Sequence, residues 1–191
     1  MPHCIGKSKH QKNVFLLFRN RIKLHTGQSI QLADSTLQVL YTHEDTINTM
    51  TGKPAFADEN DTSTVIRLTA GEMSVMITGD MDTKAEDVIM GSFTSETLSV
   101  DIMQVAHHGF NNLPEFYAAA HAPIAVIPQS EGYMHYEKPD QSADSTNKEK
   151  QEILNALGEY ATIYFSGKYE NTVGFAIRDG EVALIYGPSA S

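Results

Sequence analysis

The stretch MSVMITGD (residues 73–80), followed by VDIMQVAHHG (residues 100–109), decides how this chain folds. Each segment is an apolar run typical of a buried strand, and each ends beside a glycine and a side chain that can bind a metal ion. A helix is predicted between them, which makes the two runs neighbouring parallel strands of a strand–helix–strand unit. Ligands of such sheets bind beyond the carboxyl ends of the strands. Asp80 and the pair His107-His108 are therefore expected at one edge of the sheet.

The region from residue 73 to residue 165 alternates between strand-like and helix-like patterns. Strands are predicted at 73–78, 100–106, 124–127 and 162–165, and helices at 83–94, 114–120 and 144–157. The helix at 83–94 is expected to open with a capping box formed by Thr83 and Glu86. Antiparallel hairpins are predicted at 29–41, 63–78 and 172–186. The chain therefore predicts an α/β fold with a mixed β-sheet and covering helices.

Hairpin geometry brings one more segment to the same edge. The strand predicted at 63–68 starts where its hairpin partner ends. The strand that ends at Tyr41 points to the same edge if it pairs with 63–68 in antiparallel fashion. His43 is then close to Asp80 and His108, and the three side chains form an incomplete ligand set for zinc, manganese or iron.

Each of these motifs also has a structural explanation that involves no ligand. A Gly-Asp pair after a strand is a common turn, and a single histidine such as His43 is typical of an ordinary loop. The His-His-Gly motif is less common, so it carries more weight. His135 lies in a polar segment, 129–142, that can reach the site. The other histidines, His3, His10, His25 and His121, are interpreted as surface or packing residues.

Composition limits the functions that the chain can perform. The 191 residues, 41% of them hydrophobic, suit one globular domain with a real core. The net charge of −10 and the lack of a basic block do not favour nucleic-acid binding. Cys4 is the single cysteine, so the sequence predicts no disulfide framework. No segment approaches the roughly 18 apolar residues of a membrane span, so we expect a soluble protein. The single cysteine favours a reducing compartment such as the cytoplasm over secretion but is also compatible with a bacterial cell surface, so the localisation stays open.

Taken together, the motifs resemble those of the metallo-β-lactamase-fold hydrolases. The nearest branch contains the metallohydrolase domain of competence proteins and the phosphorylcholine esterases. The resemblance covers roughly residues 28–130 and rests on four segments: LYTHED (40–45), NDTSTVIRL (60–68), ITGD (77–80) and DIMQVAHHG (101–109). It implies an αββα sandwich with a two-metal site, usually of zinc, at one edge.

The resemblance also implies roles for individual residues. Asp80 matches the aspartate that bridges the two ions, and His108 is taken as the histidine that binds the second ion. His107 supports the ligands or contacts the substrate, which makes Asp80 and His107 the candidate catalytic residues. A two-metal site activates water and binds the oxygens of a phosphoester during hydrolysis. The resemblance therefore implies a small-molecule or phosphoester substrate.

One part of the family pattern is missing from this sequence. Residues 1–60 contain no His-x-His-x-Asp-His motif, and His3 and His10 have the wrong spacing. The chain, residues 1–191, is therefore interpreted as the C-terminal portion of one such domain, with residues 1–27 left without an assignment. We expect it to bind metal weakly and to hydrolyse little by itself. A candidate partner is the missing N-terminal half of the domain.

Two alternative functions remain open, and with them the question whether this chain alone is an enzyme. Asp80-Met81-Asp82-Thr83 looks like the nucleophile motif of haloacid-dehalogenase-type phosphatases, in which Asp80 is phosphorylated and Asp82 acts as the acid/base with Mg²⁺. No convincing downstream Asp-Asp pair supports it, and His107-His108 then has no role. The second alternative is a non-catalytic α/β interaction module.

Overall fold

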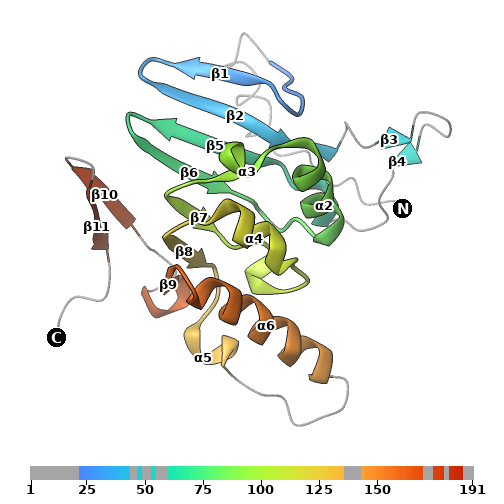
Figure 1. Cartoon of the computed structure of the whole chain (residues 1–191), viewed down its shortest axis with the longest axis vertical. Coiled ribbons are helices and arrows are strands. Elements are labelled where there is room, and N and C mark those ends of the chain that lie inside the picture. The colour runs from blue at the N-terminus through green and yellow to red at the C-terminus, as the bar shows by residue number, and fades with distance from the viewer. Residues whose placement is uncertain are drawn as a thin grey trace, which may run out of the picture.

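A seven-stranded mixed β-sheet forms the centre of the protein (Figure 1). The computed structural model describes residues 22–43, 47–48, 53–54, 60–135, 143–169, 174–178 and 181–186. In order across the sheet, the strands are β1 (Ser29–Leu32), β2 (Ser35–Tyr41), β5 (Val65–Ala70), β6 (Met73–Ile77), β7 (Ile102–Gln104), β8 (Ile124–Ile127) and β9 (Thr162–Phe165). Neighbours are antiparallel from β1 to β6 and parallel from β6 to β9. The predicted α/β fold with a mixed sheet is confirmed.

Helices connect the parallel strands and cover one face of the sheet (Figure 1). The α-helices are α2 (Thr83–Ser92), α3 (Ser95–Leu98), α4 (Pro114–Ala120), α5 (Glu131–Met134) and α6 (Ala143–Gly158), and the short 3-10 helices are η2 (Asn60–Thr62), η3 (Ala106–Gly109) and η4 (Ser166–Tyr169). The strands from β6 to β9 follow one another across the sheet in chain order. Because such crossovers are right-handed, the connecting helices fall on the same side of the sheet.

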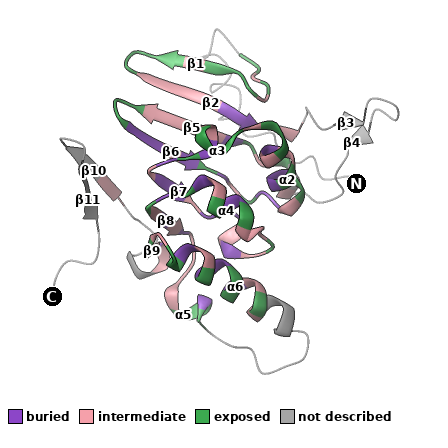
Figure 2. Cartoon of the chain, in the orientation of Figure 1, coloured by how far each residue is buried: buried purple, intermediate pink, exposed green. Residues whose placement is uncertain are grey.

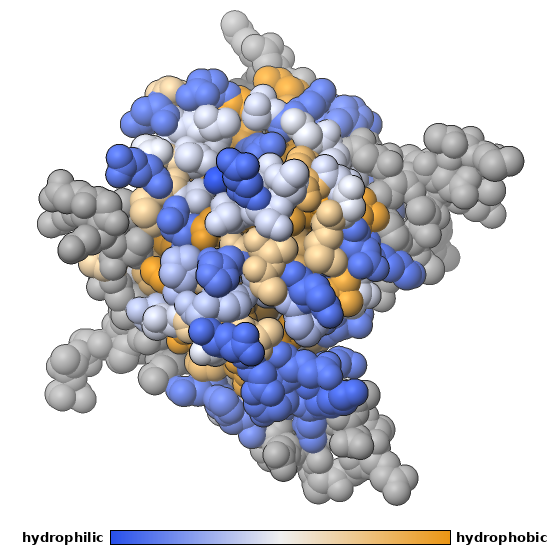
Figure 3. All heavy atoms as spheres, in the orientation of Figure 1, coloured by the Kyte–Doolittle hydropathy of each residue, from blue (hydrophilic) through white to orange (hydrophobic). Residues whose placement is uncertain are grey.

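The hydrophobic core lies between this helical layer and the sheet (Figure 2). Every second residue of the central strands belongs to it, for example Met76, Met103 and Ala125, which are next to one another in register. The helices contribute apolar side chains such as Ile89 and Phe116. Hydrophilic side chains gather on the outer surface of this layer over α6 (Figure 3). The helices are thus amphipathic, with their apolar sides against the sheet.

The opposite face of the sheet is apolar but only partly covered. Its side chains alternate with those of the core, and we call this set the open sheet face: Leu37, Val39, Ile66, Leu68, Val75, Ile77, Ile102, Ile124 and Val126. They lie beside one another in register across five strands. Val39 and Ile102 are buried yet stand outside the core cluster, while Ile77 is 41% exposed. No helix in the described part of the chain packs on this face.

Two short hairpins stand apart from the main sheet. One pairs β3 (Ile47–Asn48) with β4 (Lys53–Pro54), and the other pairs β10 (Gly174–Arg178) with β11 (Glu181–Tyr186). The Phe175 ring of β10 meets the Tyr164 ring of β9 edge to face, with centroids 5.3 Å apart. In the described residues, no helix has the length and apolar character needed to cross a lipid bilayer.

The structure corrects several local predictions. Asp82, not Thr83, caps α2, and Glu86 is buried instead of completing a capping box. The segment 44–62 was expected to be a loop, yet it contains β3, β4 and η2, and the polar segment 129–142 contains α5. Helix α3 was not predicted. The apolar run 14–18 lies outside the described residues.

Candidate functional site

The carboxyl ends of three parallel strands place the candidate ligands at one edge of the sheet. Asp80 follows β6, His107 and His108 lie in η3 after β7, and Pro128 follows β8. The Nε2 atom of His108 is 3.9 Å from Oδ1 of Asp80. Both side chains are about half exposed, at 45% for His108 and 50% for Asp80, so a small ion in solution can reach them. The structure therefore brings together the two strongest candidates from the sequence.

The hydrogen bonds of His108 determine what its ring offers to Asp80. Its Nδ1 atom lies 2.8 Å from the carbonyl oxygen of Pro128. A carbonyl can only accept, so Nδ1 carries the hydrogen, and in the neutral ring Nε2 presents a lone pair. This Nε2 atom is the one that lies 3.9 Å from the carboxylate of Asp80, which is also an acceptor. A proton or a metal cation held between the two atoms would bind to both of them.

The backbone of the histidine turn is unusual. His107 has φ 46° and His108 has φ 57°, and Gly109 follows with φ 86°. Residues with side chains rarely adopt this left-handed conformation, and surrounding contacts must hold them in it. At Gly109 a Cβ atom would lie 2.8 Å from the terminal methyl carbon of Met134. The turn therefore needs glycine at its third position.

Backbone contacts hold the aspartate loop against the histidine turn. The carbonyl oxygen of Gly79 accepts hydrogen bonds from the backbone N–H of His107 and from Nε2 of Gln104, both at 3.2 Å. The backbone N–H of Asp80 donates to the Ser63 hydroxyl at 3.1 Å. Gly79 has φ 62°, and a Cβ atom there would lie 3.2 Å from the same hydroxyl oxygen. Close packing of these loops fixes the separation of Asp80 from the histidines.

His107 faces a different neighbour from His108. Its Nε2 atom lies 3.3 Å from Nδ2 of Asn60, at the start of η2. Its Nδ1 atom is buried and has no hydrogen-bond partner among the described residues. The amide of Asn60 thus orients the ring, and the predicted supporting or substrate-contacting role of His107 stays a prediction.

His43 lies just beyond the end of β2, and β5 separates β2 from β6 in the sheet. It lines a cavity of about 440 Å³ together with Lys23, Leu24, Thr42, Thr62 and Thr64. No cluster of three or more His, Cys, Asp or Glu side chains able to hold a metal ion is found among the described residues. The structure thus groups Asp80 with His108 and places His43 in a neighbouring cavity, and its role as a ligand stays a prediction.

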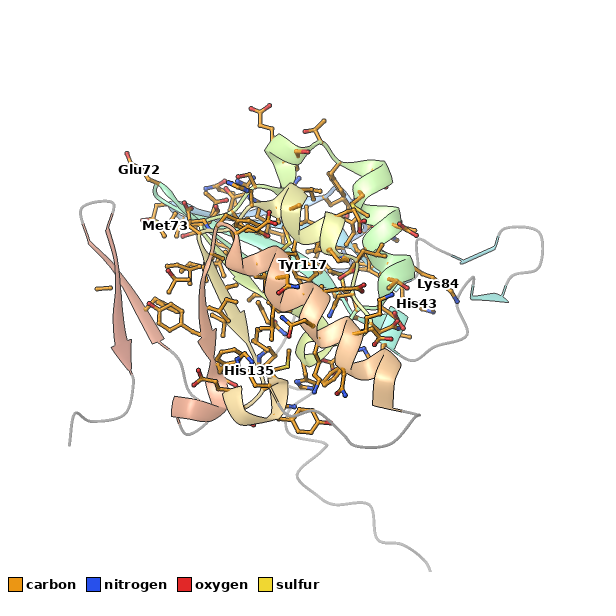
Figure 4. All side chains as sticks on the ribbon, turned by 60° about the horizontal axis from the view of Figure 1, so that its bottom comes forward. His43, Glu72, Met73, Lys84, Tyr117 and His135 are labelled. Carbon is orange, nitrogen blue, oxygen red and sulfur yellow. The ribbon has the colours of Figure 1, made fainter. Side chains whose placement is uncertain are left out.

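The sequence predicts that His135 can reach the site. It follows α5 and packs against Phe165, with ring centroids 6.0 Å apart. Figure 4 shows His135 and His43 well separated from each other. His135 is therefore held on β9 by its ring contact.

A buried polar network behind the site was missed in the sequence. Its members are Glu86 of α2, Tyr117 of α4 and Asn112, which hydrogen-bond to one another and to the backbone of Ala106 and Leu113. Figure 4 shows Tyr117 at the centre, among the helices. The sequence contains one indication of this network, because Glu86 lies between Ala85 and Ile89 on the apolar side of a predicted helix.

Asp82 belongs to the same region but not to the exposed edge. It is 7% exposed, and its Oδ1 atom accepts hydrogen bonds from the backbone N–H of Thr83 at 2.6 Å and from the side-chain amide of Asn111. Its carboxylate is thus used to start α2 and to hold the loop after the histidine turn.

Comparison with known proteins gives one partial match. No protein-family model matches the chain. Over 91 residues, 46% of its length, the chain is 32% identical to competence protein ComA of Neisseria gonorrhoeae. The matched segment covers 13% of that protein. This partial match is to a competence protein, which is one of the classes of protein that the sequence motifs resemble.

Proposed function

We propose that this chain supplies part of the metal site of a metallo-β-lactamase-like hydrolase that cleaves phosphoesters or related esters. Asp80 and His108 are the metal ligands in this proposal. The observation that carries it is the meeting of the His108 Nε2 and the Asp80 Oδ1, 3.9 Å apart at the carboxyl ends of neighbouring parallel strands. The partial likeness to a competence protein points in the same direction.

The residues present fit two positions of a zinc site. A histidine that binds a metal usually donates its other ring N–H to a carbonyl or a carboxylate, as His108 does to Pro128. Two ligands on a tetrahedral zinc ion lie about 3.4 Å apart, because each bond is about 2.1 Å long. The 3.9 Å separation of the His108 Nε2 and the Asp80 Oδ1 is close to this value. The same donor types also suit manganese and iron.

The chain's own residues have distinct roles in the proposed reaction. Asp80 and His108 would hold the metal in this proposal, each through its side chain. When bound, such ions supply Lewis acidity for ester hydrolysis. His107, oriented by Asn60, contacts the substrate or supports the ligands. The cavity beside His43 is the recess in which we place the remainder of the substrate.

The open sheet face supports the proposal that residues 1–191 form the C-terminal portion of an αββα sandwich. In a sandwich, a second sheet packs about 10 Å away and buries the inner faces of both sheets. Apolar side chains in register across five strands are what such packing requires. The second layer would also bring the ligands that Asp80 and His108 need. We therefore propose the other half of the domain as the main partner.

The dehalogenase-like alternative receives less support from the structure. A doubly wound sheet of that kind reverses its strand order and carries helices on both faces. Here the strands from β6 to β9 advance in one direction, and the helices share one face. Asp82 is a buried helix cap instead of an exposed acid. A non-catalytic interaction module remains the alternative if the chain binds no metal.

Metal binding by purified protein tests the proposal. Zinc titration followed by calorimetry should show weak binding to the wild-type chain, and His108→Ala should lower the affinity more than about tenfold. Asp80→Ala should do the same. His135→Ala is the matched control, because it removes an exposed imidazole that packs on Phe165. Equal zinc binding by the wild type and the His108 variant would refute the ligand assignment, and tight binding of two ions would refute an incomplete site.

A further inference from the structure

We propose that Glu86 is a positioning residue for the His107-His108 turn and acts on it through Tyr117 and Asn112. The contacts within the network stand independently of the proposed function. Only the last step, in which the turn presents His108 to a metal ion, rests on it.

Glu86 and Tyr117 form the buried centre of the network, and both are fully buried. Oε2 of Glu86 accepts a hydrogen bond of 2.5 Å from the backbone N–H of Leu113. Oε1 of the same carboxyl group lies 3.1 Å from the Tyr117 hydroxyl. A single side chain of α2 is thereby connected to the loop that follows the histidine turn and to helix α4.

Tyr117 and Asn112 carry the connection to the start of the turn. The Tyr117 hydroxyl accepts from the backbone N–H of Ala106 at 3.1 Å and lies 2.8 Å from Oδ1 of Asn112. Nδ2 of Asn112 donates to the carbonyl oxygen of Ala106 at 3.2 Å. Both backbone polar groups of Ala106, the residue immediately before His107, are therefore bound by the network.

The turn needs such support because its backbone is strained. Two successive histidines adopt the left-handed region, with φ 46° and 57°, and this conformation persists only where the surroundings impose it. The network holds Ala106 at the entry to the turn and Leu113 after its exit. A further hydrogen bond, from Asn111 to Asp82, fixes the same loop to the start of α2.

The number of hydrogen atoms indicates which form of Glu86 completes the network. The Tyr117 hydroxyl has one hydrogen but lies within reach of two acceptors, Glu86 and Asn112. A protonated Glu86 resolves this, because it donates to Tyr117 while Tyr117 donates to Asn112. Every polar group in the chain of contacts then has a partner.

The surroundings of Glu86 favour this protonated form. Its pKa is raised to about 8, mainly by burial and to a smaller extent by the charges of Asp82 and Asp87, against the opposing effect of hydrogen bonds with Leu113 and Tyr117. On α4, burial and the neighbouring Glu86 raise the pKa of Tyr117 well above its ordinary value, so the phenol also keeps its proton.

The proposal is tested by substitutions that keep the size of the Glu86 or Tyr117 side chain and either keep or remove its hydrogen bonds. Glu86→Gln keeps an acceptor for Leu113 and a donor for Tyr117, so it should retain the amide chemical shifts of residues 106–109 and the zinc affinity of the wild type. Tyr117→Phe and Glu86→Ala should shift those amide resonances and lower zinc affinity roughly tenfold or more. Glu96→Gln on the exposed side of α3 is the matched control and should change neither quantity.

The outcomes are distinguishable from a failure of the proposed function. If the wild type binds no zinc, the metal site is refuted, but the amide shifts of residues 106–109 in Tyr117→Phe still decide the positioning role. If Glu86→Ala does not fold, the other two network variants carry the test. The proposal is overturned if Tyr117→Phe leaves the turn unchanged, or if Glu86→Gln disturbs it as much as Tyr117→Phe does.

Discussion

Gly109 is the position in the histidine turn where both the backbone conformation and the available space favour glycine. It has φ 86°, and an added Cβ atom would lie 2.8 Å from the Met134 methyl carbon. Gly109→Ala should therefore destabilise the fold by about 1–3 kcal/mol, through backbone strain and through displacement of a buried methionine. Unfolding in urea, monitored by circular dichroism, measures this loss.

Gly91 provides the control for that substitution. It lies within α2, and an added Cβ atom there meets nothing within 4 Å. Gly91→Ala should stabilise the protein by roughly 0.5–1 kcal/mol, because alanine loses less conformational freedom in a helix. A similar loss of stability in both variants would show that the Gly109 position is not special.

At the scale of the element, the cap of α2 links helix formation to the site. Asp82 accepts from the backbone N–H of Thr83 and from the Asn111 side chain. Asp82→Ala should cost about 1–2 kcal/mol or more, because it removes a helix cap and leaves Asn111 without its acceptor. Asp82→Asn should remain close to the wild type, since asparagine caps helices about as well as aspartate.

Thermal unfolding of the two Asp82 variants tests this expectation. Asp87→Ala, an exposed change on the same helix, is the control and should be nearly neutral. The pair also separates the functional alternatives. Any metal-dependent activity should survive in Asp82→Asn, whereas an enzyme that uses Asp82 as its acid/base would lose it.

The order of the elements could be predicted from the sequence because it depends on local patterns. The hairpin of β1 and β2, the helix that begins at Pro114 and the parallel strands up to β9 follow from periodicity and turn residues. The meeting of Asp80 with His108 followed from the rule that parallel strands end at one edge.

Features that depend on contacts between distant elements could not be predicted in this way. Thr83 and Glu86 have the spacing of a capping box, but the helix starts after Asp82, and Glu86 shares the inner side of α2 with Ile89. Its partner Tyr117 lies 31 residues away, on another helix. No local pattern indicates that pairing, nor the left-handed backbone of His107 and His108 that it supports.

At the scale of the whole molecule, the two faces of the sheet differ in how far helices cover them. The core side is closed by α2, α4 and α6, whereas no helix among the described residues lies over the open sheet face, whose side chains are mostly part-buried and of which Ile77 is 41% exposed. Apolar side chains that lie together on a face without a covering helix are typical of surfaces that bind another part of a protein. The open sheet face includes side chains of β6 and β7, the strands that lead to Asp80 and to His108. A layer that covered it would therefore reach the edge at which these ligands need further partners.

The stability of the whole molecule should depend on pH through Glu86. Its pKa is raised from 4.5 to about 8, chiefly by burial, with smaller contributions from the charges of Asp82 and Asp87. Between these two values the folded state keeps a proton that the unfolded chain has released. The stabilisation is therefore fully present below pH 4.5 and is lost as the pH rises towards 8, by at most about 1.4 kcal/mol per pH unit from this group.

Urea unfolding at pH 6, 7 and 8 measures this loss as a decrease in the free energy of unfolding. Glu86→Gln cannot ionise, so its free energy of unfolding should fall less steeply over the same range. Glu96→Gln, which changes the same charge at an exposed position, should keep the steep dependence of the wild type. If the free energy of unfolding fell equally steeply with pH in the wild type and in Glu86→Gln, Glu86 would already be ionised in the folded protein. Tyr117 would then have to donate to either the carboxylate or Asn112, and the proton arrangement inferred for the network would be wrong.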